Sequence, residues 1–266
     1  MRLNHSRIRE VSSIIREISP KREEYVGELF PSLDDDPTLQ KSFFLAMVSI
    51  DHRTRSIYPY EAIINGKRYF GSELLYRKGM LIYEKDPNFF LPERLKDLPG
   101  DPLLDLLLKD PPLWDMHVRT LLLKDLGFKL HRKGMDYYLE KPKRLKEIRA
   151  YEDPVEKKIY LLIKFLEGRG LISYEGERHV AVDNHLTRLA LMAGIVDYTP
   201  PSWEVSREED ISIRMAVREA WDRVAFLAGV DPFALDDYLW RLGREGECPF
   251  CIKEVREHVH LLTWYY

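Results

Sequence analysis

The sequence contains little cysteine and no long apolar run. Cys248 and Cys251 are the only cysteines among its 266 residues, too few for a disulfide framework and usual for a reducing compartment. The clearest apolar segment, Phe43 to Ile50, is much shorter than the roughly 18 residues that a membrane span requires. The first residues lack the apolar stretch of a signal peptide. We therefore expect a cytoplasmic protein with no membrane partner.

The sequence also lacks a strong net charge, an internal repeat, a low-complexity tract and a flexible linker. The net charge of −3 gives no overall attraction to nucleic acid, so DNA binding requires a local basic face. The charged content of 32%, rich in Lys, Arg and Glu, is typical of thermophile proteins. We expect residues 1–266 to form a single compact helical unit with two lobes that acts as a monomer.

Helical periodicity dominates the chain, which predicts a mainly α fold with one or two small β-hairpins. Asn65-Gly66, between β-prone residues, predicts one hairpin at 62–70, and a turn at Gly176 suggests a second within 171–182. The expected helices cover 5–18, 38–50, 72–84, 102–109, 113–132, 142–150, 154–168, 185–194, 208–228 and 232–243.

Basic residues gather between positions 119 and 149. There are ten of them against four acidic residues, Asp125, Asp136, Glu140 and Glu147. Such a cluster is often only a solvated helix face, but it also suits a phosphate backbone, and we expect Lys143 and Arg144 to contact DNA. The ten basic residues are Arg119, Lys124, Lys129, Arg132, Lys133, Lys141, Lys143, Arg144, Lys146 and Arg149.

Charged residues stand at the starts of two apolar helices. Asp183 precedes the helix expected from residue 185, where it or Asn184 can cap the free N–H groups. Lys157 and Lys158 stand near the start of another helix. A lysine is disfavoured at the positive end of a helix, and a lysine of lowered pKa that faces a carboxylate suits Schiff-base chemistry. The alternative is that both lysines are solvated surface residues.

Three separated segments belong to one pattern, a lysine before an apolar helix followed later by a Val-Asp-x-His motif. The segments are EKKIYLLIKFL, VDNHLTRLALMAGIV and AWDRVAFLAGVDPFALDDYLWRLGR. In order and spacing they resemble the helix-hairpin-helix DNA glycosylase superfamily, and in particular the archaeal 8-oxoguanine DNA glycosylase (N-glycosylase/DNA lyase) family. The resemblance covers about residues 150–245, and FFLAMVSIDHRT adds a weaker part.

The resemblance implies a two-lobed helical glycosylase fold, with the catalytic segment at about 150–245. It implies a DNA base-excision repair glycosylase with AP lyase activity, which removes a damaged purine such as 8-oxoguanine without a metal or other cofactor. Lys157 would be the nucleophile and Asp183 its carboxylate partner. Asp236 and Trp240, one turn apart on a helix, would bind the extruded base. Asp237, Tyr238 and Trp221 are further pocket candidates.

The sequence departs from the family pattern at three places. Residues 152–156 replace the usual Gly-x-Gly hairpin, Lys158 stands where Thr is common, and the 62–70 hairpin matches no family segment. The adjacent lysines leave open whether Lys157 or Lys158 is the nucleophile. The altered hairpin and the acidic net charge also fit a non-catalytic or differently specific nucleic-acid-binding member of the same fold. A helical protein-interaction module is a further alternative.

Two further motifs have simpler interpretations. Four residues near the end of the sequence are of types that bind zinc: Cys248, Cys251, His258 and His260. The spacing of the two histidines does not match a standard zinc site, so we expect no metal. His52 and Arg53 suit a polar helix end better than a DNA wedge.

Overall fold

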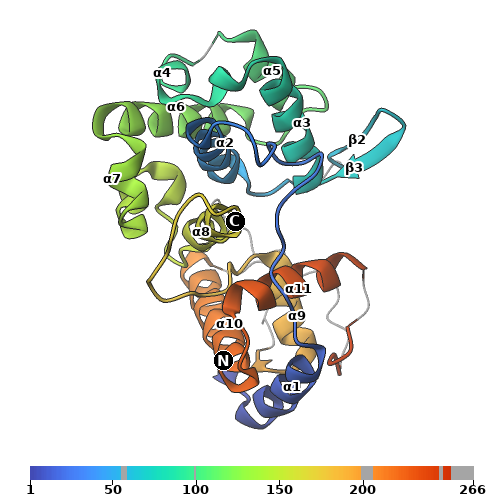
Figure 1. Cartoon of the computed structure of the whole chain (residues 1–266). Coiled ribbons are helices and arrows are strands. Elements are labelled where there is room, and N and C mark those ends of the chain that lie inside the picture. The colour runs from blue at the N-terminus through green and yellow to red at the C-terminus, as the bar shows by residue number, and fades with distance from the viewer. Residues whose placement is uncertain (55–58, 99, 199–205, 246–247, 253–266) are drawn as a thin grey trace.

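The computed structural model describes residues 1–54, 59–98, 100–198, 206–245 and 248–252, and within these ranges the chain is mainly helical (Figure 1). The β-structure described there is limited to two antiparallel pairs of short strands. The expected mainly α fold class is confirmed. Within the same ranges, no helix has the length and apolar character needed to cross a membrane.

The elements follow the chain in the order β1 (Arg2–Leu3), α1 (His5–Ile18), α2 (Pro37–Ile50), β2 (Glu61–Ile64), β3 (Lys67–Phe70), α3 (Ser72–Lys85), η1 (Pro87–Phe90), α4 (Pro92–Leu95), α5 (Pro102–Leu108), α6 (Met116–Lys133), α7 (Met135–Leu139), η2 (Pro142–Glu147), η3 (Arg149–Tyr151), α8 (Lys157–Gly168), α9 (Asn184–Ala193), β4 (Val196–Asp197), α10 (Arg207–Ala228) and α11 (Pro232–Glu245), where η marks a 3-10 helix.

Polar caps place several helix ends close to where the sequence predicts them. Asn4 accepts a hydrogen bond from the N–H of Arg7 at 3.1 Å at the start of α1, and Ser206 accepts from Glu209 at 3.2 Å at the start of α10. Each cap satisfies an N–H group that the first helical turn leaves unpaired. Nine of the ten expected helices are confirmed to within three residues at each end.

The helix expected over 142–150 is wrong. Two short 3-10 helices, η2 and η3, occupy this stretch, and Ile148 between them is extended, with φ −98° and ψ 122°. Leu145 and Ile148 are both fully buried. Short 3-10 turns commonly serve as connectors, and the break here lets both side chains enter the core.

One of the two expected hairpins is present. β2 and β3 pair in antiparallel register, and Asn65 and Gly66 between them have φ of 51° and 80°, as a two-residue turn of this kind requires. The hairpin suggested within 171–182 is wrong, because that segment contains no strand. The second strand pair joins β1 to β4 from distant parts of the sequence.

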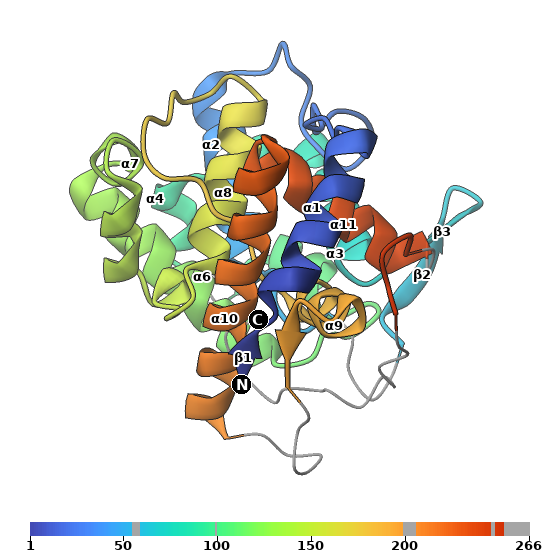
Figure 2. The same cartoon turned by 90° about the horizontal axis from the view of Figure 1, so that it is seen from below.

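The buried apolar residues form two clusters. The first is built mainly from α2 to α8, and the second from α1, α9, α10 and α11. Figures 1 and 2 show α8 between these two groups of helices. Val155, just before α8, already belongs to the second cluster, while Ile159 to Leu166 belong to the first. The start of α8 therefore lies at the boundary between the clusters.

Residues 19–36, called the strap here, connect α1 in the second cluster to α2 in the first. Tyr25 of the strap packs on Gly168 so closely that a Cβ atom at Gly168 would lie 2.5 Å from the tyrosine ring. The buried Arg169 donates to the carbonyls of Tyr25 at 3.1 Å and Pro31 at 2.8 Å. The strap is thus fixed at the end of α8.

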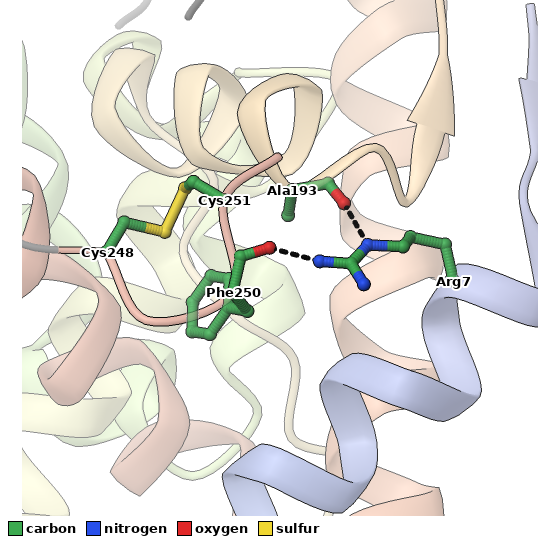
Figure 3. The surroundings of a disulfide bond; sticks show 5 residues. All are labelled: Arg7, Ala193, Cys248, Phe250 and Cys251. Carbon is green, nitrogen blue, oxygen red and sulfur yellow. Dashed lines mark hydrogen bonds between the residues drawn. A yellow bond between two sulfur atoms is a disulfide. The ribbon is translucent and has the colours of Figure 1, made fainter. Parts of the chain in front are cut away.

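Cys248 and Cys251 form a disulfide bond (Figure 3). A single bond across three residues is not a disulfide framework. Arg7 of α1 holds the same loop, because its guanidinium donates to the carbonyls of Phe250 and Ala193, the latter at 2.8 Å.

Candidate catalytic site

The lysine pair at the start of α8 lies against the carbonyl end of α2. Lys158 Nζ donates to the Ser49 carbonyl at 2.6 Å and lies 3.2 Å from His52 Nδ1. Lys157 Nζ donates to the Asp51 carbonyl at 3.2 Å. The last carbonyls of a helix carry partial negative charge and need donors, so both ammonium groups are placed where α2 attracts cations.

Arg119 of α6 is a third basic side chain against the carbonyl end of α2. Its side chain is fully buried and donates to the carbonyls of Ile50 and His52. Burial lowers the pKa of Arg119 to about 10, and nearby acidic groups oppose that shift. Arg119 therefore does not belong to the basic surface in which the sequence analysis counted it.

Burial controls the electrostatics around Lys158. It lowers the pKa of the Lys158 ammonium to about 7, and the charge of Lys157 acts in the same direction. Burial also holds the pKa of His52 well below its ordinary value, which leaves the ring neutral. His52 is thus a buried helix-end residue. Asp153 accepts from the Lys158 backbone N–H at 3.1 Å, and burial raises its pKa.

Lys157 and Lys158 differ in the exposed fraction of their side chains and in the carbonyl that each amine contacts. Lys157 retains 7% of its accessible surface and Lys158 only 2%. Lys157 also stands seven residues before Lys164, so the two share a helix face and lie roughly 10 Å apart along the axis. Lys164 pairs with Asp236 of α11, whereas Lys157 contacts the end of α2, so this face of α8 carries one lysine against each group of helices.

Asp183 caps α9, as the sequence predicts. Its Oδ1 accepts the N–H of Leu186 at 2.8 Å, and its side chain is half-buried. Within the described ranges, no hydrogen bond or ion pair joins Asp183 to Lys157 or Lys158. The structure therefore does not bring the two expected catalytic groups, Lys157 and Asp183, into contact.

Asp236 and Trp240 both lie on α11. Asp236 is buried; its Oδ2 pairs with Lys164, and its Oδ1 accepts the N–H of Ala181 at 2.8 Å. Burial raises the pKa of Asp236 to about 6, Lys164 opposes the shift, and the charge of Asp183 adds to it. Trp240 is half-buried against the second cluster. The bond from Ala181 brings the segment before Asp183 against α11.

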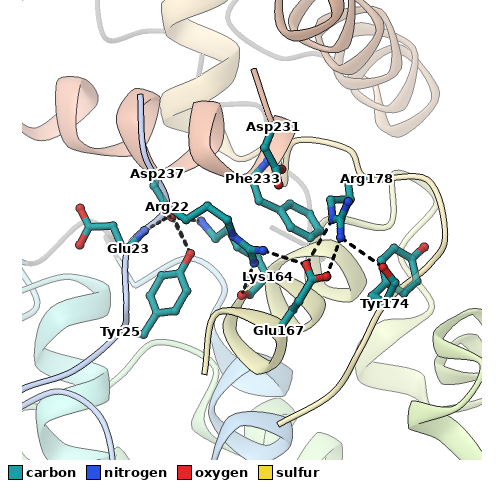
Figure 4. Close-up of polar contacts among 10 residues, drawn as sticks. All are labelled: Arg22, Glu23, Tyr25, Lys164, Glu167, Tyr174, Arg178, Asp231, Phe233 and Asp237. Carbon is teal, nitrogen blue, oxygen red and sulfur yellow. Dashed lines mark hydrogen bonds and ion pairs between the residues drawn. The ribbon is translucent and has the colours of Figure 1, made fainter. Parts of the chain in front are cut away.

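The other pocket candidates have structural contacts. Asp237 accepts the Tyr25 hydroxyl at 2.7 Å and pairs with Lys164 at 2.8 Å (Figure 4). Trp221 is fully buried and donates to the Leu186 carbonyl at 3.1 Å. Tyr238 is half-buried.

The segment 171–182 is held by carboxylates from the helices around it. Arg178 pairs with Glu167 of α8 at 2.6 Å (Figure 4), and His179 Nδ1 lies 2.6 Å from Asp222 of α10. Together with the Ala181 contact, these bonds replace the strand pairing that a hairpin would provide. They hold in place the segment that leads to Asp183.

Lys143 and Arg144 differ in exposure. Lys143 is exposed, whereas Arg144 is half-buried, donates to the Tyr137 carbonyl at 2.8 Å and covers the Tyr137 ring at 4.2 Å. Lys146, on the same η2 helix, pairs with Glu156 at 2.5 Å. This bond connects the basic surface to the turn before Lys157.

Sequence reasoning overlooked the buried ionic residues that surround the candidates, chiefly Lys164, Arg214 and Asp210. Each interrupts an apolar helix face, which is the signal that could have found them. Arg214 and Asp210 are moreover one turn apart on α10, the spacing of a helical ion pair.

The described ranges contain no group of three His, Cys, Asp or Glu residues arranged to hold a metal ion. Cys248 and Cys251 are joined in the disulfide, so they are not free thiolates for zinc. The zinc interpretation also involved His258 and His260, which lie outside the described residues.

Comparison with known proteins gives a partial match. No protein-family model matches the sequence. A segment of 65 residues is 37% identical to an N-glycosylase/DNA lyase of Pyrobaculum aerophilum, covering 24% of this chain and 23% of that protein. The chain thus matches about a quarter of the relative's length, and over that segment the similarity supports a relationship to N-glycosylase/DNA lyases.

Among solved structures, the 8-oxoguanine DNA glycosylase of Pyrobaculum aerophilum in complex with 8-oxoguanosine is similar with a TM-score of 0.42 and 20% identity. That alignment covers 91% of this chain and 89% of the other.

Proposed function

We propose that this protein is a DNA base-excision repair glycosylase with AP lyase activity, which removes a damaged purine such as 8-oxoguanine through a Schiff base. The observation that carries the proposal is the lysine pair at the boundary of the two clusters, in a chain whose next helix is capped by Asp183. The partial sequence similarity to an N-glycosylase/DNA lyase points to the same chemistry.

Lys157 is the proposed nucleophile. Its amine has one carbonyl partner and some exposure, whereas Lys158 has two polar neighbours and is almost fully enclosed. A nucleophile has to leave its resting contact to reach the sugar, and Lys157 has fewer contacts to leave. Lys158 in this scheme remains at the end of α2.

The reaction proceeds on a nucleotide rotated out of the duplex, at a cost of about a few kcal/mol. The neutral amine of Lys157 forms a bond to C1′ while the bond from C1′ to the base breaks, and the base leaves with a proton. Asp183 stabilises the positive charge that develops on the sugar. The sugar ring then opens as the C1′–O4′ bond breaks and O4′ takes up a proton, which leaves a protonated Schiff base. Loss of a proton from C2′ expels the 3′ phosphate by β-elimination, which is the lyase step.

Trp240 and Asp236 are proposed to receive the base. An indole on α11 can stack on the extruded ring, and a carboxylate one turn earlier can accept from its N–H groups. Both oxygens of Asp236 already have donors, so an N–H of the base would replace one of them. The surface around Lys143 and Arg144 is proposed to hold the DNA backbone.

The contacts of the lysines also favour one alternative function. Both amines bind carbonyls of α2, so the pair could serve only to cap that helix in a non-catalytic nucleic-acid-binding protein. The two functions differ in whether a covalent intermediate forms.

Borohydride trapping on DNA that contains 8-oxoguanine or an abasic site separates them. We expect a covalent adduct with the wild-type protein and none with Lys157→Gln, because an amide cannot form an imine. Lys158→Gln is the matched control and should retain trapping. Loss of trapping in Lys158→Gln alone would identify Lys158 as the nucleophile, and its absence in wild type over a panel of lesions would favour the non-catalytic function.

A further inference from the structure

A fully buried arginine on α10 flanks Asp183 without taking part in the proposed reaction. Arg214 has no exposed surface, and its Nε lies 3.0 Å and 3.1 Å from the two carboxylate oxygens of Asp210, one helical turn earlier. Asp210 is equally buried. The pair is a fixed structure inside the second group of helices.

The rest of the Arg214 guanidinium reaches the two chain neighbours of Asp183. One terminal nitrogen donates to the Asn184 side-chain oxygen at 2.6 Å, and the other lies 3.5 Å from the Val182 carbonyl. A guanidinium is planar and presents its donors in a rigid fork. Arg214 therefore contacts the chain on both sides of Asp183, through the Val182 backbone carbonyl and the Asn184 side chain.

Stability alone does not account for this arrangement. Replacing a buried ion pair by apolar residues of similar volume is often neutral or stabilising. The helix cap itself needs only the bond from Leu186 to Asp183. The contacts of Arg214 add something that capping does not require, which is a defined position for residues 182 and 184.

We propose that Arg214, held by Asp210, is a positioning residue for Asp183. It sets the direction of the carboxylate toward the sugar and does not contact the substrate. The inference rests on the proposed function, because it assumes that Asp183 acts in catalysis. A displacement of about 1 Å in a reacting group can cost a hundredfold in rate, so the geometry around Asp183 has a measurable effect.

A mutant cycle between positions 214 and 183 tests the proposal. Arg214→Lys keeps a positive charge beside Asp210 but loses the fork. We expect it to lower the single-turnover excision rate by about tenfold to a hundredfold while the Kd for lesion DNA is unchanged. In an Asp183→Asn background the same change should have no further effect, because the carboxylate that it positions is already absent.

Equal losses in both backgrounds would overturn the proposal, since Arg214 would then act independently of Asp183. An unchanged rate for Arg214→Lys would overturn it as well. If Asp183→Asn itself is silent while wild type is active, the proposed role of Asp183 fails instead, which is a separate result. Melting temperatures identify variants that do not fold.

Asn184→Ala provides a second variant in case Arg214→Lys does not fold. Asn184 is exposed, so its truncation leaves the buried pair in place but removes one of the two contacts beside Asp183. We expect a smaller loss in single-turnover rate, about threefold, again absent in the Asp183→Asn background. A wild-type rate would show that this contact does not position the carboxylate.

Discussion

Lys157 and Lys158 are neighbours in the chain with different chemical surroundings. Lys158 is enclosed between Ser49 and His52, while Lys157 shares a helix face with Lys164 at the boundary of the two clusters. The sequence indicated that a lysine stands at a helix start, but not which amine the end of α2 would enclose. That difference arises from tertiary packing, which local periodicity does not contain.

Lys158 should make the stability of the protein depend on pH. Its pKa is about 7 in the folded protein and about 10.4 in an unfolded chain, so between these values the unfolded state binds more protons. The free energy of unfolding should therefore rise with pH in this window, by at most about 1.4 kcal/mol per pH unit. Denaturant titrations at pH 7, 8 and 9 measure the slope.

Lys158→Met provides the control for that slope, because methionine fills a similar volume and does not titrate. The variant should have a flatter dependence on pH than wild type. Identical slopes for the two proteins would mean that Lys158 keeps its proton throughout this range.

At the scale of elements, the sequence predicted helices well and connections poorly. Caps such as Asn4 and Ser206 and the Asn65-Gly66 turn act over a few residues, so the pattern contains them. The segment 171–182 looked like a hairpin because short apolar pieces flank Gly176. Its hydrogen-bond partners are instead on α8, α10 and α11, which no local pattern identifies.

For the candidate residues too, local features were predicted from the sequence and long-range contacts were not. Asp183 was recognised as a cap from its place before an apolar helix, and the structure confirms that cap. The chemical role of Asp183 came from family resemblance and remains a prediction. The contacts of Arg214 with residues 182 and 184 were not predictable, since they join segments about 30 residues apart.

The η2 helix offers a test of DNA contacts. Lys143 is exposed, so Lys143→Ala should weaken binding to all DNA sequences alike, flatten the salt dependence by roughly one unit and leave the melting temperature unchanged. Arg144→Ala should behave differently, because it removes the bond to Tyr137 and should lower stability by about 1 kcal/mol. Affinity measured against salt concentration, with thermal melts, separates the two. An unchanged salt slope for Lys143→Ala would make this a solvated face.

At the scale of the whole molecule, the strap joins the two clusters through tight contacts. Tyr25 donates its hydroxyl to Asp237 of α11 (Figure 4) and packs on Gly168 of α8. Lys164 pairs with both Asp236 and Asp237, so the same buried charges hold the strap and the proposed base-binding helix. A substitution in the strap should therefore alter the position of α11.

Gly168→Ala tests this contact. The added methyl group would overlap the Tyr25 ring and should destabilise the protein by about 1–3 kcal/mol, the usual cost of overpacking. In a Tyr25→Ala background the ring is absent and the cost should be smaller, leaving only the contact with the Glu23 carbonyl at 3.3 Å. Denaturant unfolding of the four proteins measures the coupling, and equal costs in both backgrounds would contradict the close approach.

The position of α1 has a consequence for synthesis on the ribosome. α1 is synthesised well before α10, yet it packs beside α10 (Figure 2), and Arg16 donates to a carbonyl 211 residues further along the chain. Contacts between residues so far apart in sequence form slowly, and domains generally fold as units during synthesis. The apolar side of α1, with Ile8, Val11 and Ile15, therefore stays exposed to solvent until α10 has been synthesised. During that interval the exposed apolar surface of α1 should be available to chaperones.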